Sequence, residues 1–137
     1  MILSLDTNVM IDILNDREGR VRARYSAARA GGDRLVACSI TAQELIYGAM
    51  ISPRPRVHVP NAERLLEELE IEPWTPEDGV ATARLRLALR KTGSTIGALD
   101  ALIAGQALHR NWVMVSANLR EFERVEGLRV IDWKADA

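Results

Sequence analysis

The sequence predicts an α/β protein of three layers, in which helices cover both faces of a central, mostly parallel sheet of four to five strands. Short apolar runs alternate along the chain with longer stretches of helical periodicity, and this alternation is typical of a parallel sheet covered by helices. The chain has 137 residues, of which 47% are hydrophobic and 27% are charged, as is usual for a protein with one core. We see no internal repeat, low-complexity tract or long linker, and therefore expect a single domain over residues 1–137.

The first half of the chain predicts two strands and the helices that follow them. Residues 2–5 and 35–38 are short apolar runs bounded by polar residues, which favours strands. Asp6-Thr7-Asn8 offers capping side chains for a helix whose apolar residues share one face. A helix over 20–30 should end at a pair of glycines, and another is expected over about 41–50. Residues 51–60 contain three prolines, so we expect a loop there.

The second half predicts three more helices and the remaining strands. Asn61 can cap a helix that reaches about residue 69, and a short extended piece follows at 71–74. Thr75-Pro76-Glu77-Asp78 is a strong helix start, because proline suits the first turn and acidic side chains favour a helix N-terminus. That helix should end near Gly93. A helix over 99–108 then precedes strands at 113–116 and 128–131.

Charge and cysteine content exclude several classes of protein. The formal net charge of −1 excludes a uniformly basic nucleic-acid binder, although residues 16–34 hold six arginines that suit contact with phosphate. Cys38 is the single cysteine, so an intramolecular disulfide is impossible. No apolar run has the length of a membrane span, and the N-terminus lacks the basic region of a signal peptide. We expect a protein of the reducing cytoplasm, with no membrane association.

Three acidic residues each have a structural and a functional interpretation. Asp6 follows the first strand, where it can cap the next helix or face a ligand at the carboxyl edge of the sheet. Glu44 closes the pattern Thr41-Ala42-Gln43-Glu44, and taken alone this favours a capping box. Asp100 lies in a helix that is otherwise apolar except for Gln106. Because a buried carboxylate needs a counter-charge, a bound cation or an arginine is expected beside Asp100.

A further group of polar side chains follows the strand predicted at 113–116. Ser116, Asn118 and Glu121 belong at the same carboxyl edge as the three acids, although serine and asparagine are also common in turns. All of these donors are oxygen atoms, which Mg²⁺ and Mn²⁺ prefer. Such a cluster can polarise a phosphodiester and activate water.

Four sequence blocks resemble the signature blocks of PIN-domain nucleases, in order and over the whole chain. They are Leu5-Asp6-Thr7-Asn8-Val9, Thr41-Ala42-Gln43-Glu44-Leu45-Ile46-Tyr47-Gly48, Ile96-Gly97-Ala98-Leu99-Asp100-Ala101-Leu102-Ile103-Ala104 and the stretch from Val115 to Leu128. Their order and spacing are most similar to those of bacterial VapC toxins from type II toxin–antitoxin pairs.

The resemblance implies an endoribonuclease, a hydrolase of phosphodiester bonds that depends on Mg²⁺ or Mn²⁺. It places the family's first three acids on Asp6, Glu44 and Asp100, which with Glu121 form the expected catalytic set. The family's fourth acidic position falls on Asn118 or on Glu121. Expected metal ligands are Asp6, Glu44, Asp100 and Asn118, with Asn8 and Ser116 in support.

The resemblance also implies partners. The family suggests structured RNA such as tRNA as substrate, a homodimer, and silencing by a cognate VapB-like antitoxin within a toxin–antitoxin assembly. The silencing segment of such antitoxins enters the cleft, often with an arginine on the acids, where a guanidinium can replace the metal as counter-charge.

Two other functions compete with the nuclease hypothesis. An aspartyl phosphatase would use Asp6 as nucleophile, but those enzymes usually carry a second aspartate where this chain has Asn8. A PIN-like module that only binds RNA or protein has no need for clustered acids, because carboxylates repel phosphate unless a metal intervenes.

Overall fold

A parallel sheet of five strands forms the centre of the computed structural model, which describes residues 1–15 and 19–135. The strands are β1 (Ile2–Leu5), β2 (Arg34–Cys38), β3 (Glu70–Glu72), β4 (Val113–Val115) and β5 (Arg129–Ile131). Their order across the sheet is β3-β2-β1-β4-β5, so the first strand in the chain is the central one. In the register of β1, Leu3 lies opposite Leu35 on one side and Leu5 lies opposite Val115 on the other.

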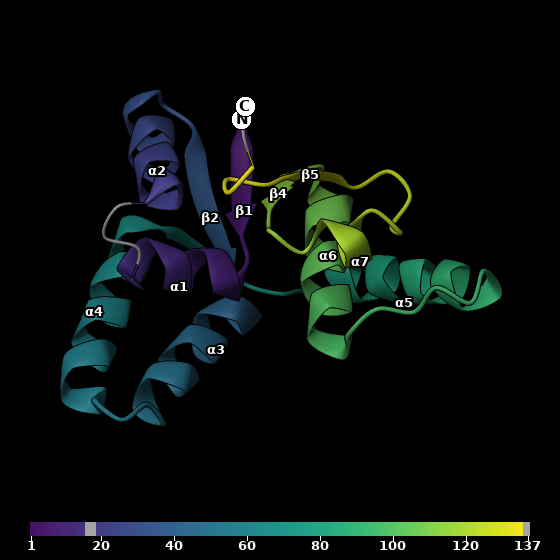
Figure 1. The fold of residues 1–137 in the computed structure, drawn as a ribbon. Coiled ribbons are helices and arrows are strands. Elements are labelled where there is room, and N and C mark those ends of the chain that lie inside the picture. The colour runs from purple at the N-terminus through teal and green to yellow at the C-terminus, as the bar shows by residue number, and fades with distance from the viewer. Residues whose placement is uncertain (16–18, 136–137) are drawn as a thin grey trace.

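Helices cover both faces of the sheet (Figure 1). One layer comprises α1 (Thr7–Asn15), α2 (Arg20–Ala30), α3 (Ser39–Met50) and α4 (Pro55–Glu68), and the other comprises α5 (Pro76–Lys91), α6 (Ala98–Arg110) and α7 (Leu119–Phe122). Successive side chains of a strand point to opposite faces. Leu35 and Ala37 of β2 accordingly join the core under the first layer, whereas Val36 and Cys38 join the core under the second. The predicted three-layer α/β/α class is confirmed.

The start of α4 corrects the sequence analysis. Residues 51–60 were expected to form a loop, but α4 begins at Pro55 and contains Pro60. Pro55 occupies the first turn, where its missing N–H has no helical partner to lose. Pro60 is exposed, so water can hydrate the carbonyl that its absent N–H leaves free. Apolar side chains such as Ala62 and Leu65 bury the inner face of the helix, and this packing outweighs the cost of the second proline.

Several smaller differences concern single elements. The helix α3 begins at Ser39, two residues before the predicted start, and α7 follows β4 as a single turn that the sequence analysis did not predict. A helix of four residues carries almost no periodic signal. Strand β3 lies at 70–72 rather than 71–74, and Ser116 follows β4 instead of ending it.

The arginines of α2 bind backbone carbonyls. Arg22 donates through Nε and Nη2 to the carbonyl oxygen of Ile13 at 2.9 and 2.7 Å, at the C-terminal end of α1. Arg20 and Arg24 donate to the carbonyls of Lys134 and Asp132, which joins the C-terminal segment to α2. These contacts give the three arginines structural roles. Arg17, a member of the same basic run, lies outside the described residues.

No helix in the described ranges 1–15 and 19–135 is both long enough and apolar enough to cross a membrane.

Candidate active site

Asp6 lies directly after the central strand and both caps a helix and faces the other acids. Its Oδ1 accepts a hydrogen bond from the backbone N–H of Val9 at 2.8 Å, in the first turn of α1. The register of β1 with β4 brings Ser116 alongside, and the Ser116 hydroxyl hydrogen-bonds the Asp6 carboxylate. Asp6 is buried, which raises its pKa, while the bonds from Ser116 and Val9 act in the opposite direction. The two interpretations of Asp6 are therefore compatible.

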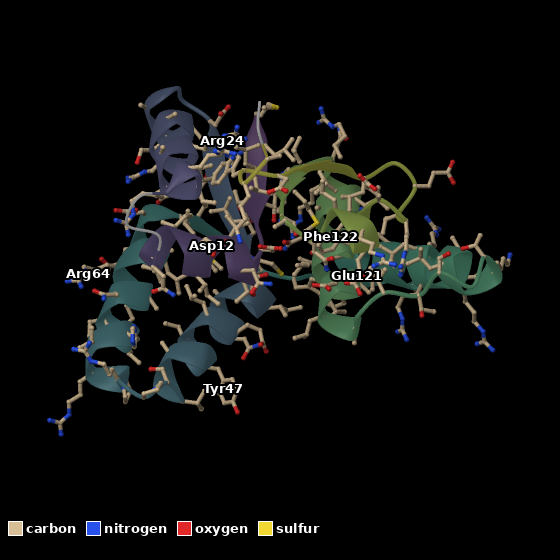
Figure 2. All side chains as sticks on the ribbon, viewed as in Figure 1. Asp12, Arg24, Tyr47, Arg64, Glu121 and Phe122 are labelled. Atoms are coloured by element: carbon tan, nitrogen blue, oxygen red, sulfur yellow. The ribbon has the colours of Figure 1, made fainter. Side chains whose placement is uncertain are left out.

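Asp100, in the first turn of α6, meets the carboxyl group of Glu121 from α7. Burial, followed by the hydrogen bond and the negative charge of Glu121, raises the pKa of Asp100 to about 7, and the charge of Asp6 adds to this effect. The contact with Asp100 lowers the pKa of Glu121, as do hydrogen bonds from Asn118 and from the backbone N–H of Gly97. Two carboxyl groups can share a hydrogen bond only when one of them holds a proton, which accounts for the opposite directions of the two pKa shifts. Figure 2 shows Glu121 on α7 beside the α6 region of the structure.

The loop between β4 and α7 holds Ser116 and Asn118 by an ordered set of hydrogen bonds. The backbone N–H of Asn118 donates to Ser116 Oγ at 2.9 Å, and Asn118 Nδ2 donates to Glu121 Oε2 at 2.9 Å. The nitrogen of Asn118, which is not a metal-ligand atom, thus faces Glu121. Ser116 is fully buried, and its backbone N–H donates to the carbonyl of Ile131 at 3.0 Å. The loop is therefore joined to the sheet on one side and to the acids on the other.

Glu44 approaches the same region from α3, but without the predicted capping box. Thr41 is buried within the helix, two residues after its start, and therefore does not cap it. Glu44 Oε1 instead accepts a hydrogen bond from Gln43 Nε2 at 2.7 Å. The capping-box interpretation of Glu44 was wrong, because the helix begins earlier than the pattern implied. Thr75 and Asp78 at the start of α5 form a capping box of this kind.

A cavity of about 230 Å³ brings Asp6, Glu44 and Asp100 together. Its lining consists of Asp6, Thr7, Asn8, Ile40, Thr41, Glu44, Leu99, Asp100 and Ile103. Three separate elements thus deliver a carboxylate to one hollow, with Glu121 hydrogen-bonded to Asp100. The roles of the Gly97 N–H and of the apolar wall formed by Leu99 and Ile103 could not be predicted from sequence, since a backbone donor and ordinary core residues carry no motif.

The chemistry of these donors fits a hard divalent cation. In the part of the chain that the structure describes, no three His, Cys, Asp or Glu side chains are grouped closely enough to enclose an ion by themselves. Mg²⁺ does not need such a cage, because it keeps several waters and is often bound through one or two carboxylates. Burial first, and then the neighbouring Glu121 and Asp6, raise the pKa of Asp100, and a bound cation would favour its ionised form.

A larger hollow of about 420 Å³ adjoins the acidic cavity and shares Glu44 with it. It lies between α1, α3 and α4, and its lining includes Ile11, Leu14, Val57 and His58. Ile11 is 38% exposed and Val57 is 40% exposed, which leaves apolar surface uncovered in this groove. We call this hollow the α1–α4 groove.

Comparison with known proteins agrees with this geometry. The family model described as "PIN domain" matches residues 3–128. The chain is 36% identical over 129 residues to "tRNA(fMet)-specific endonuclease VapC" of Salmonella typhimurium, which covers 94% of this chain and 96% of the relative. It is equally identical, over the same shares of both chains, to "Ribonuclease VapC2" of Haemophilus influenzae.

Solved structures show the same fold. A DNA-bound VapBC from Salmonella typhimurium matches with a TM-score of 0.89 and 34% identity, over 97% of this chain and 98% of the other. VapBC2 from Rickettsia felis, bound to a DNA fragment from its promoter, matches with a TM-score of 0.90 and 28% identity, over 97% and 99%. With the family model spanning most of the sequence and relatives above 30% identity along nearly its full length, the chain belongs to the PIN-domain family and to its VapC branch.

Proposed function

We propose that the protein is an endoribonuclease that requires Mg²⁺ or Mn²⁺ and acts as the toxin of a VapBC-like toxin–antitoxin pair. The observation that carries this proposal is the convergence of Asp6, Glu44 and Asp100 on one cavity. These residues are proposed to hold the metal either directly or through its bound waters, and Glu121 completes the acidic set beside Asp100. Bound there, a divalent ion would polarise the scissile phosphodiester and lower the pKa of an attacking water.

Neighbouring residues orient the carboxylates of the site by hydrogen bonds. The Val9 N–H and the Ser116 hydroxyl hold the Asp6 carboxylate at the end of the central strand. The Gly97 N–H holds Glu121, which in turn contacts Asp100. Asn8 and Thr7 line the rim of the cavity. Fixed carboxylates of this kind hold an ion and its waters with little reorganisation during the reaction.

The proposed substrate is RNA, and the relatives' names support tRNA as its class. One relative is a tRNA(fMet)-specific endonuclease, and others are ribonucleases. Incubation of the purified chain with total tRNA and with unstructured RNA, with Mg²⁺, Mn²⁺ or EDTA, tests this assignment. Cleavage that requires the ion is expected, and cleavage that persists in EDTA would contradict the proposed metal dependence.

Asp6→Asn and Asp100→Asn should lower the rate of cleavage by about a hundredfold or more, because losing even a supporting residue of a metal site costs about 10–100-fold. Both variants should remain folded, since each removes one of several crowded negative charges. A phosphatase substrate assayed in parallel tests the aspartyl-phosphatase alternative. RNA binding without cleavage under all of these conditions would favour a non-catalytic PIN-like module.

The proposed partner is a VapB-like antitoxin that covers the α1–α4 groove, within a homodimeric toxin in the cytoplasm. The solved structures of relatives are VapBC complexes, and the groove joins the acidic cavity at Glu44. An apolar segment in the groove would therefore extend toward the acids. The double variant Ile11→Asp, Val57→Asp should lose inhibition by the antitoxin encoded beside the toxin gene while still cleaving RNA. Inhibition equal to that of the wild type would place the antitoxin elsewhere.

A further inference from the structure

The hydrogen bond between Asn118 and Glu121 has a defined direction. The side chain of Asn118 donates from Nδ2 to Glu121 Oε2 at 2.9 Å, since an amide nitrogen donates hydrogen bonds and a carboxylate oxygen accepts them. One N–H of the Asn118 side chain is therefore used in the hydrogen bond to Glu121, and this bond determines the orientation of the Asn118 side chain.

The backbone of Asn118 is fixed independently of its side chain. Its N–H donates to the buried Ser116 Oγ, and its carbonyl accepts from the N–H of Phe122 at 3.3 Å. Ser116 is in turn joined to the sheet through the carbonyl of Ile131. The backbone that carries the Asn118 side chain is thus hydrogen-bonded to the sheet through Ser116.

Glu121 itself lies on a short element and needs orientation. The helix α7 has four residues, and the Glu121 side chain has three rotatable bonds. Besides Asp100, its carboxylate has two hydrogen-bond donors, the Gly97 N–H and the Asn118 amide. Asn118 supplies the one side-chain amide among these contacts.

We infer that Asn118 is a positioning residue, which holds the Glu121 carboxylate against Asp100 so that both face a bound cation together. This role differs from direct ligation by Asn118, and it builds on the proposed metal-dependent function. The inference predicts that removal of the Asn118 side-chain amide lowers the affinity for the metal only when Glu121 is present.

A double-mutant cycle on Mn²⁺ affinity, measured by electron paramagnetic resonance without RNA, tests the inference. Asn118→Ala and the shape-matched Asn118→Leu should each weaken Mn²⁺ binding by about tenfold, the size expected from losing one hydrogen bond to a charged group. In a Glu121→Ala background, the same changes should have little further effect. An equal loss in both backgrounds would identify Asn118 as a direct ligand, and no loss in either would remove any role; both results overturn the inference.

A second measurement uses the metal-free protein, so that it is independent of the proposed function. The side-chain amide ¹H and ¹⁵N resonances of Asn118 should be well resolved in the wild type and should shift in Glu121→Ala. Unchanged resonances would overturn the inference even if Mn²⁺ binds. If the wild type binds no Mn²⁺, the proposed metal dependence fails, and the amide resonances alone decide whether Asn118 holds Glu121.

Tyr25→Phe provides a matched control. Tyr25 also donates from a neutral side chain to a glutamate, Glu68, at 2.6 Å. This pair joins α2 to α4 and takes no part in the acidic cavity. Tyr25→Phe should leave the affinity for Mn²⁺ and the Asn118 resonances unchanged, and an equal loss of affinity in this variant would show that the Asn118 effect is a general loss of stability.

Discussion

A carboxyl group whose pKa lies near neutral pH is the most unusual residue-scale feature of the site. Burial and the neighbouring Glu121 raise the pKa of Asp100 to about 7, whereas unfolded aspartate ionises near 3.8. The folded protein therefore binds a proton that the unfolded chain has released. A cation bound beside Asp100 would favour the ionised carboxylate, so protons and metal ions compete for this carboxyl group.

The pH dependence of stability follows from the sign of this shift. In metal-free protein, the free energy of unfolding should fall as pH rises from about 5 to about 7, because the folded state binds more protons than the unfolded state in that window. The lowered pKa of Glu121 acts only below its ordinary value of 4.5. Urea unfolding at a series of pH values measures the slope. Asp100→Asn should make the slope smaller, leaving the contribution of Asp6, whose pKa is also raised, and an unchanged slope in this variant would assign the effect to other groups.

The substitution Glu44→Gln distinguishes a role of Glu44 in catalysis from a role in the stability of α3. Glu44 forms no capping box, so the substitution should leave the free energy of unfolding within about 0.5 kcal/mol of the wild type. The charge that Glu44 adds to the cavity is lost, so cleavage of RNA should fall by about tenfold or more. Thermal unfolding and single-turnover cleavage measure the two effects. Full activity in Glu44→Gln would remove Glu44 from the proposed metal site.

Sequence alone could identify the acids but not their contacts. Asp6 and Asp100 were predictable because one directly follows a strand and the other interrupts an apolar helix. The hydrogen bond between Asp100 and Glu121 was not, because it depends on where the short helix α7 lies against α6. The direction of the Asn118 amide likewise follows from that placement, and no spacing in the sequence encodes it.

At the scale of elements, the two long helices of the second layer approach each other closely at a glycine. A Cβ placed on Gly105 of α6 would lie 1.8 Å from Thr82 Oγ1 and 2.9 Å from Thr82 Cα of α5. The Thr82 hydroxyl also donates to the carbonyl of Asp78 at 2.8 Å, so it cannot turn aside without losing that bond. The two helices can therefore pack this closely only because residue 105 has no side chain.

Gly105→Ala should therefore destabilise the protein by about 1–3 kcal/mol, the usual cost of overpacking a core. Gly48 of α3 is the matched control, because a Cβ there meets nothing within 4 Å. Gly48→Ala should stabilise the helix by about 0.5–1 kcal/mol, since alanine has the higher helix propensity. Denaturant unfolding of both variants gives the comparison. Equal effects would show that α5 and α6 can move apart at little cost.

The elements differed in how far sequence predicted them. The helix over Arg20–Ala30 and the helix over Pro76–Lys91 have the predicted ends, because glycine and a proline-containing capping box mark them. The start of α4 was missed because prolines usually end helices, whereas here the first one occupies the initial turn. Burial of its inner face, which only the assembled layer provides, decided the structure of that segment.

At the scale of the whole molecule, the two cores share a single sheet, and the prediction of one domain can be tested. Trp133 lies in the core beneath α1–α4, whereas Trp112 lies in the core beneath α5–α7, with Trp74 packed against it. In the Trp133→Phe variant, fluorescence reports the core beneath α5–α7, and in the Trp74→Phe, Trp112→Phe double variant it reports the core beneath α1–α4. For each variant, the unfolding transition in denaturant measured by fluorescence should coincide with the one measured by circular dichroism. Resolved transitions within either variant would show two independently unfolding units.

The central position of β1 also governs when the acids can meet during synthesis. The ribosome makes Asp6 first, yet the neighbours that orient it, Ser116 and the strand β4, emerge near the end of translation. Glu121, which contacts Asp100, is made later still, because α7 follows β4 in the chain. The acids of a nascent chain therefore cannot assemble before β4 has been made, so the nuclease proposed here would become active only close to release from the ribosome.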